Sequence, residues 1–360
     1  MLEPNKLKNR YKELDALRGI AALMVVFFHF TMGRRDEYNS FFKLGTTGVD
    51  LFFIISGFVI FLSINQVSNI KEFIINRVSR LYPTYWTAVS FTFIFIVSIA
   101  LQAKTFGTEH LFLKYLANLT MFHFYLDTDN LDGPYWTMII EMLFYITIMI
   151  FYRFKILSHI RTIGVITCII IFISNNFYFD NYYVQYYMLW VPIFQFIPLF
   201  FSGILFYKLY HEKQHKLINY LIIILCLICQ ITFFTFSGRS SSFISQFQYA
   251  TMLTIYFTLF TLFVNHKLQF IVNRFTLFMG KISFALYLIH QFVSLKYIIP
   301  YFHLELGINF WVVTFLINLP ILIIIASIIT FKVEVPLSKK MKNVLLEKFN
   351  SKKIQEESLS

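Results

Sequence analysis

The stretch LDALRGIAALMVVFFHFTMG, residues 14–33, decides what kind of protein this is. It is long and apolar enough to cross a bilayer, because about 20 such residues span a hydrocarbon core of about 30 Å. Beyond Asp15 at its very start, two ionisable side chains interrupt it, Arg18 in its first turns and His29 near its end. The 11 steps between them rise about 16 Å along a helix, about half of that core. Because ionisable groups are costly inside a membrane, both are candidates for function.

The rest of the chain has the same character. Of its 360 residues, 58% are hydrophobic and only 14% are charged, and the mean hydropathy is +0.64. We therefore predict an all-α integral membrane protein with about ten transmembrane helices. A shorter run at residues 111–126 is interrupted by polar side chains and is expected to be interfacial or re-entrant. The ten spanning runs lie at residues 14–33, 46–65, 84–103, 135–152, 160–177, 189–207, 217–236, 244–265, 281–299 and 309–331.

Charge predicts the orientation of these helices. With the N-terminus inside, most of the 31 Lys and Arg residues fall on the inner side, which predicts that both termini are cytoplasmic. Residues 1–13 then form a cytoplasmic segment, 14–335 the membrane domain and 336–360 a short charged cytoplasmic tail. The first run is expected to be a retained span rather than a cleaved signal. The net charge of +12 is explained by topology and contact with anionic lipid, not by nucleic acid.

A carboxylate is expected beside His29. The second span begins near Thr46 on the outer side, which puts Asp50 at nearly the depth of His29. Such a carboxylate would fix the imidazole tautomer and leave the other ring nitrogen free to act as a general base. The alternative is a buried pair that only joins two helices. Glu141, about six residues into the fourth span, could bind an acceptor hydroxyl, tune His29 or serve a structural pair.

Arginines gather at the opposite depth. Arg18 begins the first span, and Arg77 and Arg80 precede the third. Guanidinium groups bind phosphate oxygens in a bidentate manner, although positive-inside topology alone also explains arginines here. In the ninth span, Tyr287 and His290 are three residues apart and share one helix face. They could line a cavity or bridge helices.

Metal chemistry has a weaker basis. His211-Glu-Lys-Gln-His215 matches a zinc-protease pattern, and Leu131-Asp132-Gly133 is similar to a third-ligand motif of intramembrane zinc proteases. The predicted topology separates the two motifs by about a membrane thickness, so they cannot share a metal ion. The first motif is interpreted as a solvated loop. Cys168, Cys226 and Cys229 lie in apolar runs and predict neither a disulfide framework nor a zinc cluster.

The same segments, in their order along residues 14–335, resemble the acyltransferase 3 family, membrane enzymes that acylate surface carbohydrates. Five pieces carry the resemblance: Leu14-Asp-Ala-Leu-Arg18-Gly19 with ten residues before His29; Gly48-Val-Asp50 through Ser56-Gly57-Phe58; Arg77-Val-Ser-Arg80-Leu-Tyr-Pro83-Thr-Tyr85; Gly133-Pro-Tyr-Trp136 with Glu141; and Ser283 through Tyr287 to His290.

The resemblance implies ten helices, a donor acyl-CoA supplied from the cytosol and an acceptor sugar handled at the opposite face. It implies no permanently bound cofactor and makes His29 the catalytic residue, either as a general base or as the nucleophile of an acyl-histidine intermediate. Further site residues follow by the same comparison: Arg18, Arg77 and Arg80 for the CoA phosphates, Asp50 and Glu141 as partners of His29, and Tyr287, His290, Trp136 and Ser56 as candidates for lining a cavity.

The expected enzyme is thus a multi-pass O-acetyltransferase of the bacterial cytoplasmic (inner) membrane. Its expected acceptor is an O-antigen or other surface-glycan sugar, free or as a lipid-linked oligosaccharide. Two other classes compete with this interpretation. A transporter of a lipid-linked sugar or small molecule would explain many helices without catalysis. A structural subunit of an envelope complex would have no use for aligned ionisable groups.

Overall fold

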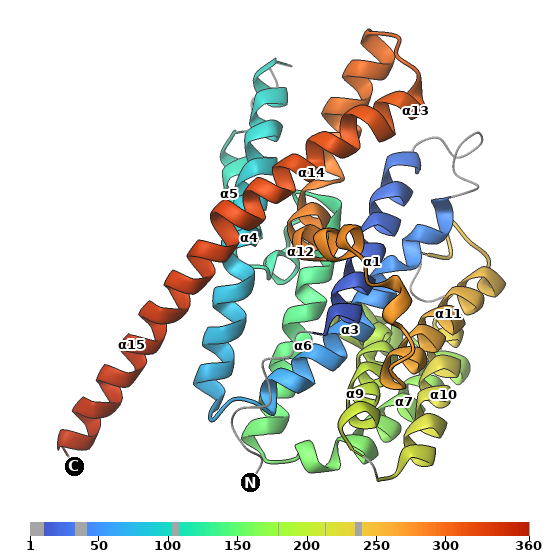
Figure 1. The fold of residues 1–360 in the computed structure, drawn as a ribbon, viewed down its shortest axis with the longest axis vertical. Helices are drawn as coiled ribbons and strands as arrows, with labels where there is room; N and C mark the ends of the chain where they lie inside the picture. The colour runs from blue at the N-terminus through green and yellow to red at the C-terminus, as the bar shows by residue number, and fades with distance from the viewer. Residues whose placement is uncertain are drawn as a thin grey trace.

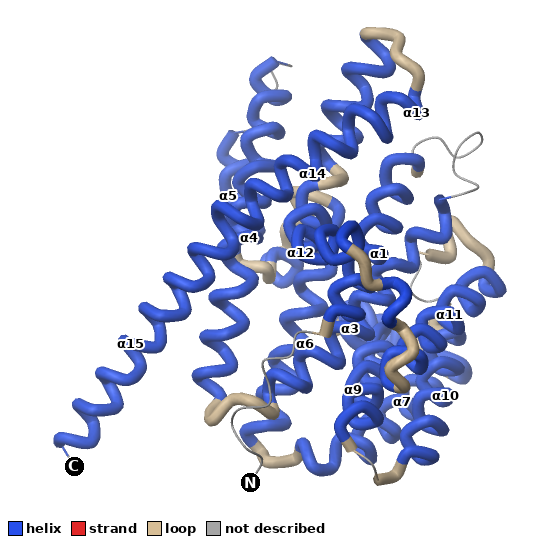
Figure 2. The backbone as a smooth tube through the Cα atoms, in the orientation of Figure 1, coloured by secondary structure: helices blue, strands red, loops and turns tan. Residues whose placement is uncertain are grey.

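The computed structural model describes residues 11–32, 42–102, 108–178, 180–212, 214–234 and 240–359. Within these ranges every regular element is a helix and there is no strand (Figure 2). The predicted all-α membrane architecture is confirmed. Its α-helices are α1 (Lys12–Thr31), α3 (Gly48–Ile64), α4 (Ile70–Gln102), α5 (Thr108–Leu119), α6 (Trp136–Arg153), α7 (Ile160–Phe177), α8 (Tyr182–Trp190), α9 (Ile197–His211), α10 (Lys216–Thr232), α11 (Gln246–Val264), α12 (Arg274–Ile289), α13 (Phe310–Val312), α14 (Leu319–Ile328) and α15 (Val335–Leu359).

Tighter and wider turns connect or extend these helices. The 3-10 turns are η1 (Lys43–Thr47), η2 (His123–Leu126), η3 (Gly133–Tyr135), η4 (Leu157–His159), η5 (Pro192–Phe196) and η6 (Gln269–Ile271). The π-helical segments are η7 (Ser294–Ile298), η8 (Tyr301–Glu305), η9 (Val313–Asn318) and η10 (Ile329–Glu334).

Eight helical segments among the described residues are long and apolar enough to cross a membrane. A ninth is counted if α12 and residues Ser294–Glu305, which meet at an angle of 61°, form one bent span. Helix α10 coincides with the remaining predicted run and is apolar, but it has only 17 residues. Residues 111–126 fall on α5 and η2, which are shorter than a span. Which end of each helix faces the cytosol stays a prediction.

Helices α1 and α12 pack directly against each other because small residues meet at their contact. A methyl group on Gly19 would come within 2.7 Å of the Gly280 nitrogen, and one on Gly280 would overlap the Asp15 carbonyl. Small residues that let backbones approach this closely are typical of helix contacts in membranes. The consequence for function is that the C-terminal half of α12 lies beside the C-terminal half of α1.

The second close contact joins α3 to α9. A methyl group on Gly57 would overlap the Phe200 carbonyl, and one on Gly203 would overlap that of Ile54. Helix α3 also contacts α1 and α6, so it lies at the centre of the bundle (Figure 1). Its residues can therefore face two cavities, one toward each end of α1.

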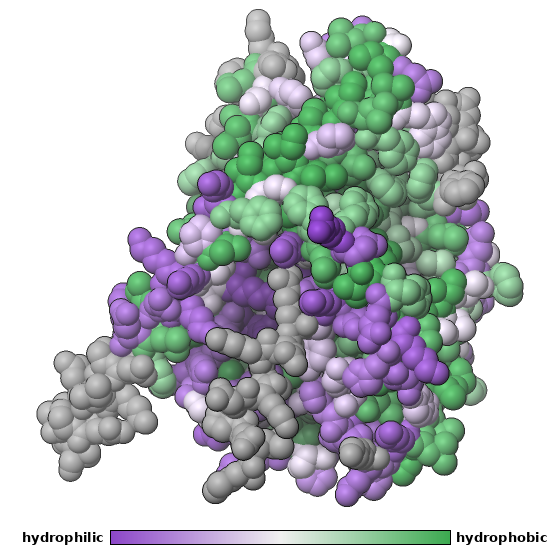
Figure 3. All heavy atoms as spheres, in the orientation of Figure 1, coloured by the Kyte–Doolittle hydropathy of each residue, from purple (hydrophilic) through white to green (hydrophobic). Residues whose placement is uncertain are grey.

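The surface of the molecule is divided into apolar and polar regions. In Figure 3 apolar side chains cover the region of α13 and α14, and polar side chains surround a recess below it. Helix α15 extends away from the bundle toward the C-terminal end (Figure 1). Large apolar side chains are exposed on the outer faces of α7 and α10, including Ile166, Ile170 and Leu221. Such faces suit contact with lipid. Cys168, Cys226 and Cys229 are buried and free.

Candidate active site

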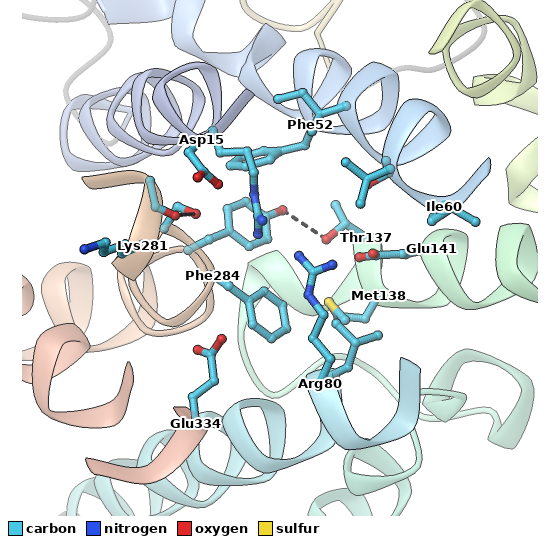
Figure 4. Close-up of a pocket in the computed structure, with 18 of the residues that line it drawn as sticks. Asp15, Phe52, Ile60, Arg80, Thr137, Met138, Glu141, Lys281, Phe284 and Glu334 are labelled. Carbon is cyan, nitrogen blue, oxygen red and sulfur yellow. Dashed lines mark hydrogen bonds between the residues drawn. The ribbon is translucent and has the colours of Figure 1, made fainter. Parts of the chain in front are cut away.

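Two cavities lie along α1; after the predicted topology, we call the one at its Arg18 end the inner cavity and the one at its His29 end the outer cavity. The inner cavity has a volume of about 480 Å³ and is lined by α1, α3, α4, α6, α12 and η10 (Figure 4). All three predicted arginines line it, so the structure brings Arg18, Arg77 and Arg80 together. Arg77 and Arg80 are three residues apart on α4 and share a face. Of the expected cavity residues, Ser56 and Tyr287 are also part of this lining.

Two nitrogen atoms of a buried guanidinium group in this cavity lack hydrogen-bond partners. Arg77 is only 8% exposed, and its Nε and Nη1 atoms have no hydrogen-bond partner. Its charge lies 5.4 Å from the centre of the Phe73 ring and 5.7 Å from that of Tyr145. No ion pair within the described part of the chain engages Arg77 or Arg80. A buried guanidinium without an ion-pair partner is costly, so this geometry favours an anionic ligand.

Acidic side chains share the same cavity. The Tyr145 hydroxyl donates a hydrogen bond to Glu141 Oε1 over 2.5 Å. Figure 4 shows the Glu141 carboxylate and the Arg80 guanidinium directed toward the cavity, with Glu334 on its other side and the Lys281 amine directed away. Glu141 therefore belongs to the arginine cavity and is not among the residues around His29. The sequence-based prediction that Glu141 lies near His29 is therefore wrong, because it placed Glu141 too close to the His29 end of the bundle.

The outer cavity is smaller, about 260 Å³, and lies at the His29 end of α1. It brings together His29 and Asp50, as the sequence predicted, and Trp136, which was expected to line a cavity, is also part of its lining. Hydroxyl side chains that sequence analysis did not single out complete its polar lining: Thr46, Ser240, Ser242 and Tyr249. These come from residues that carry no recognisable motif, so only the fold identifies them.

The two cavities are neighbours. Both are lined by Val49 and Tyr287, and the Phe52 ring lies 5.7 Å from that of Tyr287. The Tyr287 hydroxyl lies 3.1 Å from the Thr137 hydroxyl and 3.4 Å from the Pro134 carbonyl. A few side chains thus separate the arginine cavity from the histidine cavity.

His29 has a different partner from the one expected. Its Nδ1 lies 3.0 Å from the Val25 carbonyl oxygen and 3.0 Å from Nε2 of His290. Asp50 instead accepts a hydrogen bond of 3.3 Å from the Tyr249 hydroxyl. Asp50 is therefore at the predicted depth but is not hydrogen-bonded to His29. Counting residues along a helix predicts how deep a side chain lies but not the direction in which it points. The rotation of each helix about its axis therefore explains this correction.

His290 is completely buried behind His29 and belongs to the lining of neither cavity described above. Its Nδ1 lies 2.6 Å from the Tyr287 carbonyl oxygen. The expected choice between cavity lining and helix bridging is thus resolved: Tyr287 lines both cavities, and His290 connects α12 to α1.

The zinc-protease pattern lies elsewhere. Glu212 forms ion pairs with Arg161 at 2.5 Å and Lys208 at 2.7 Å, and the Tyr11 hydroxyl lies 3.1 Å from His211 Nε2. Asp132 accepts hydrogen bonds from the Phe292 backbone. Lys213 lies outside the described residues. No cluster of potential metal ligands is present in the ranges that the structure describes.

Comparisons with known proteins agree on a family. A family model for an acyltransferase domain matches residues 11–331. A protein of Acidianus two-tailed virus named "Putative acetyltransferase ORF330" is 25% identical over 292 residues, which cover 79% of this chain and 83% of that protein. An uncharacterized protein of Haemophilus influenzae is 27% identical over 155 residues, 38% of this chain and 63% of the relative. No solved structure matches the chain. With the family match extending from the start of α1 into η10, the chain belongs to the acyltransferase 3 family of membrane acyltransferases.

Proposed function

We propose that this protein is a membrane O-acyltransferase that transfers an acyl group, acetyl in the first instance, from acyl-CoA to a sugar hydroxyl of a surface polysaccharide. The observation that carries the proposal is the pair of neighbouring cavities. One presents three arginines, among them the buried Arg77 with two unsatisfied nitrogen atoms, and the other presents a histidine. A transporter needs no such arrangement of a phosphate site beside a base.

The donor is assigned to the inner cavity. Arg18, Arg77 and Arg80 would bind the CoA phosphates through charge-assisted hydrogen bonds. Arg18 and His29 are separated by about 16 Å along α1, a distance that an extended pantetheine arm is suited to cover. The thioester would then pass between Val49 and Tyr287 to reach His29.

The acceptor is assigned to the outer cavity. Hydroxyl groups of Thr46 and Ser240 and the carboxylate of Asp50 provide hydrogen-bonding partners for a sugar, and Trp136 provides an aromatic surface. Such mixed lining suits carbohydrate better than an apolar substrate. We infer that the acceptor is an O-antigen or other surface-glycan sugar, free or lipid-linked, in a bacterial cytoplasmic membrane with the arginine cavity open to the cytosol.

In the proposed reaction, His29 removes the proton of the sugar hydroxyl as that oxygen attacks the thioester carbonyl carbon. The resulting tetrahedral intermediate collapses with cleavage of the carbon–sulfur bond. The proton held by His29 passes to the departing thiolate, which leaves CoA as its thiol and the sugar as an ester. Positioning of the two substrates in adjoining cavities supplies the remaining acceleration.

The test compares surface glycans from cells that lack the protein and carry the wild type, His29→Ala or His266→Ala. His266 is an exposed histidine outside both cavities and serves as the matched control. Mass spectrometry should find alkali-labile acyl esters with the wild type and with His266→Ala only. Purified His29→Ala protein should still bind acetyl-CoA. Undiminished esterification by His29→Ala would overturn the assignment.

A further inference from the structure

Helix α12 is broken beside the site. It ends at Ile289, and the next helical segment, Ser294–Glu305, leaves at an angle of 61°. Non-helical backbone at membrane depth is tolerated only where protein groups satisfy it. Here both carboxylate oxygens of Asp132 accept the backbone N–H of Phe292, at 3.1 and 3.3 Å. The break thus has a built support, and His290 is the first residue of that break.

The contacts of His290 determine where its protons are. A carbonyl oxygen can only accept, so the 2.6 Å contact with Tyr287 requires a hydrogen on Nδ1 of His290. In the neutral ring, Nε2 of His290 then carries a lone pair and can only accept.

The same logic applies to His29. Its Nδ1 contacts the Val25 carbonyl and must carry a hydrogen, and the same N–H is 3.0 Å from the lone pair on His290 Nε2. One N–H is therefore shared between two acceptors, a common arrangement at helix ends. The lone pair of His29 is then on Nε2, which has no hydrogen-bond partner within the described chain. That nitrogen is the one available to a substrate in the outer cavity.

We propose that His290 is the positioning residue for His29: it holds His29 in the Nδ1–H tautomer and shares the positive charge that His29 acquires during transfer. This inference rests on the proposed function, in which His29 is the base. A carboxylate usually has this role beside a catalytic histidine. Here a neutral imidazole has it, held by the Tyr287 carbonyl.

The protons balance through the cycle. When Nε2 of His29 takes the hydroxyl proton, its Nδ1–H becomes a stronger donor to His290 Nε2, which spreads the charge over two rings. When the thiolate departs, the Nε2 proton goes to sulfur, and both imidazoles return to their neutral tautomers. His290 gains no net proton and touches neither substrate.

Three variants test this role: His290→Phe, His290→Gln and His29→Ala. Phe retains a ring of similar size without an acceptor, and Gln restores an acceptor oxygen. Initial rates are measured against acetyl-CoA concentration, with membranes from cells lacking the protein as the source of acceptor glycan. We expect His290→Phe to lower kcat about 10²- to 10⁴-fold with KM for acetyl-CoA unchanged. His290→Gln should recover at least about tenfold of that loss, because it can again accept the His29 N–H.

A purely structural histidine would give another pattern. Gln and Phe would then fail together, with losses of activity that follow losses in thermal stability, and that result would overturn the inference. Wild-type kcat in His290→Phe would also overturn it. If His290→Phe does not accumulate, His290→Met replaces it as the variant without an acceptor. In the double variant with His29→Ala, the His290 change should cost nothing further.

The outcomes also separate this inference from the proposed function. An inactive His29→Ala beside a fully active His290→Phe refutes only the role of His290. A fully active His29→Ala refutes the proposed function itself, whatever the His290 variants do.

Discussion

Replacing Arg77 with Met tests whether the inner cavity is built for an anion. The Arg77 guanidinium is buried with two unpartnered nitrogen atoms, so a bound phosphate would give it its missing hydrogen bonds. A hydrogen bond to a charged group contributes about 1.5–3 kcal/mol. Arg77→Met should therefore weaken acetyl-CoA binding about 10- to 150-fold, since each 1.4 kcal/mol is a factor of about ten.

Thermal unfolding in detergent measures this effect. At a ligand concentration of about 100 times the wild-type Kd, acetyl-CoA stabilises the protein by about 2.7 kcal/mol. With the weakened affinity, the same concentration should stabilise Arg77→Met by only about 0.3–1.4 kcal/mol. The wild-type shift should also shrink as salt is added, because phosphate contacts are screened.

The ligand-free protein gives an independent result. Removing an unpaired buried charge relieves a desolvation cost, whereas the lost interaction with the Phe73 and Tyr145 rings is worth about 0.5–1 kcal/mol each. The melting temperature without ligand should therefore not fall. Arg274→Met is the matched control, since Arg274 is exposed at the start of α12 and outside the cavity. An unchanged acetyl-CoA shift in Arg77→Met, or equal losses in both variants, would refute the reasoning.

Three further changes probe other parts of the structure. Trp136→Ala should raise KM for acceptor glycan several-fold while acetyl-CoA binding is unchanged, because Trp136 lines only the outer of the two cavities; equal weakening of both substrates would contradict this. Gly57→Val should lower the free energy of unfolding by about 1–3 kcal/mol or more by forcing α3 from α9, and Ser63→Val should not; chemical denaturation compares them. Burial raises the pKa of Asp132 to about 7. Because the folded state then holds this proton more tightly than the unfolded chain, the stabilisation is complete below about pH 4 and lost as pH rises through 7. The melting temperature should thus fall more steeply between about pH 5 and pH 8 in the wild type than in Asp132→Asn, and parallel curves would contradict this.

The helices could be predicted from sequence because the bilayer accepts only long, apolar, internally hydrogen-bonded segments. The break at His290 could not. Residues 290–293 contain neither Pro nor Gly, the usual local causes of a kink. The support comes instead from Asp132, which lies 160 positions earlier in the chain. A contact at that sequence separation is a property of the packed bundle and leaves no periodic signal in α12.

The sequence predicted the depth of the site residues along their helices but not the rotation of those helices about their axes. Counting residues along helices correctly put His29 and Asp50 at one level, and both line the outer cavity. A helical side chain must also lie on the correct side of its helix to make a contact, and each residue turns that direction by about 100°. A helix that is rotated by the equivalent of one or two residues therefore presents a different side chain to His29. This is enough to make His290, and not Asp50, the hydrogen-bond partner of His29. The close approach of Gly19 to Gly280 sets that angle between α1 and α12.

This contact has a consequence for both halves of the proposed reaction. Helix α1 carries Arg18 at the level of the contact with Gly280 and His29 well beyond it. Helix α12 carries Tyr287, which lines both cavities, and leads directly into His290. Because both helices contribute to the two cavities and to the histidine pair, a shift of one helix along the other would disturb the phosphate site and the histidine pair together. In the proposed reaction, the distance from the phosphate site to the base is then set by α1 alone, because Arg18 and His29 both lie on it. The tautomer of His29 is set by the contact of α1 with His290, which follows α12.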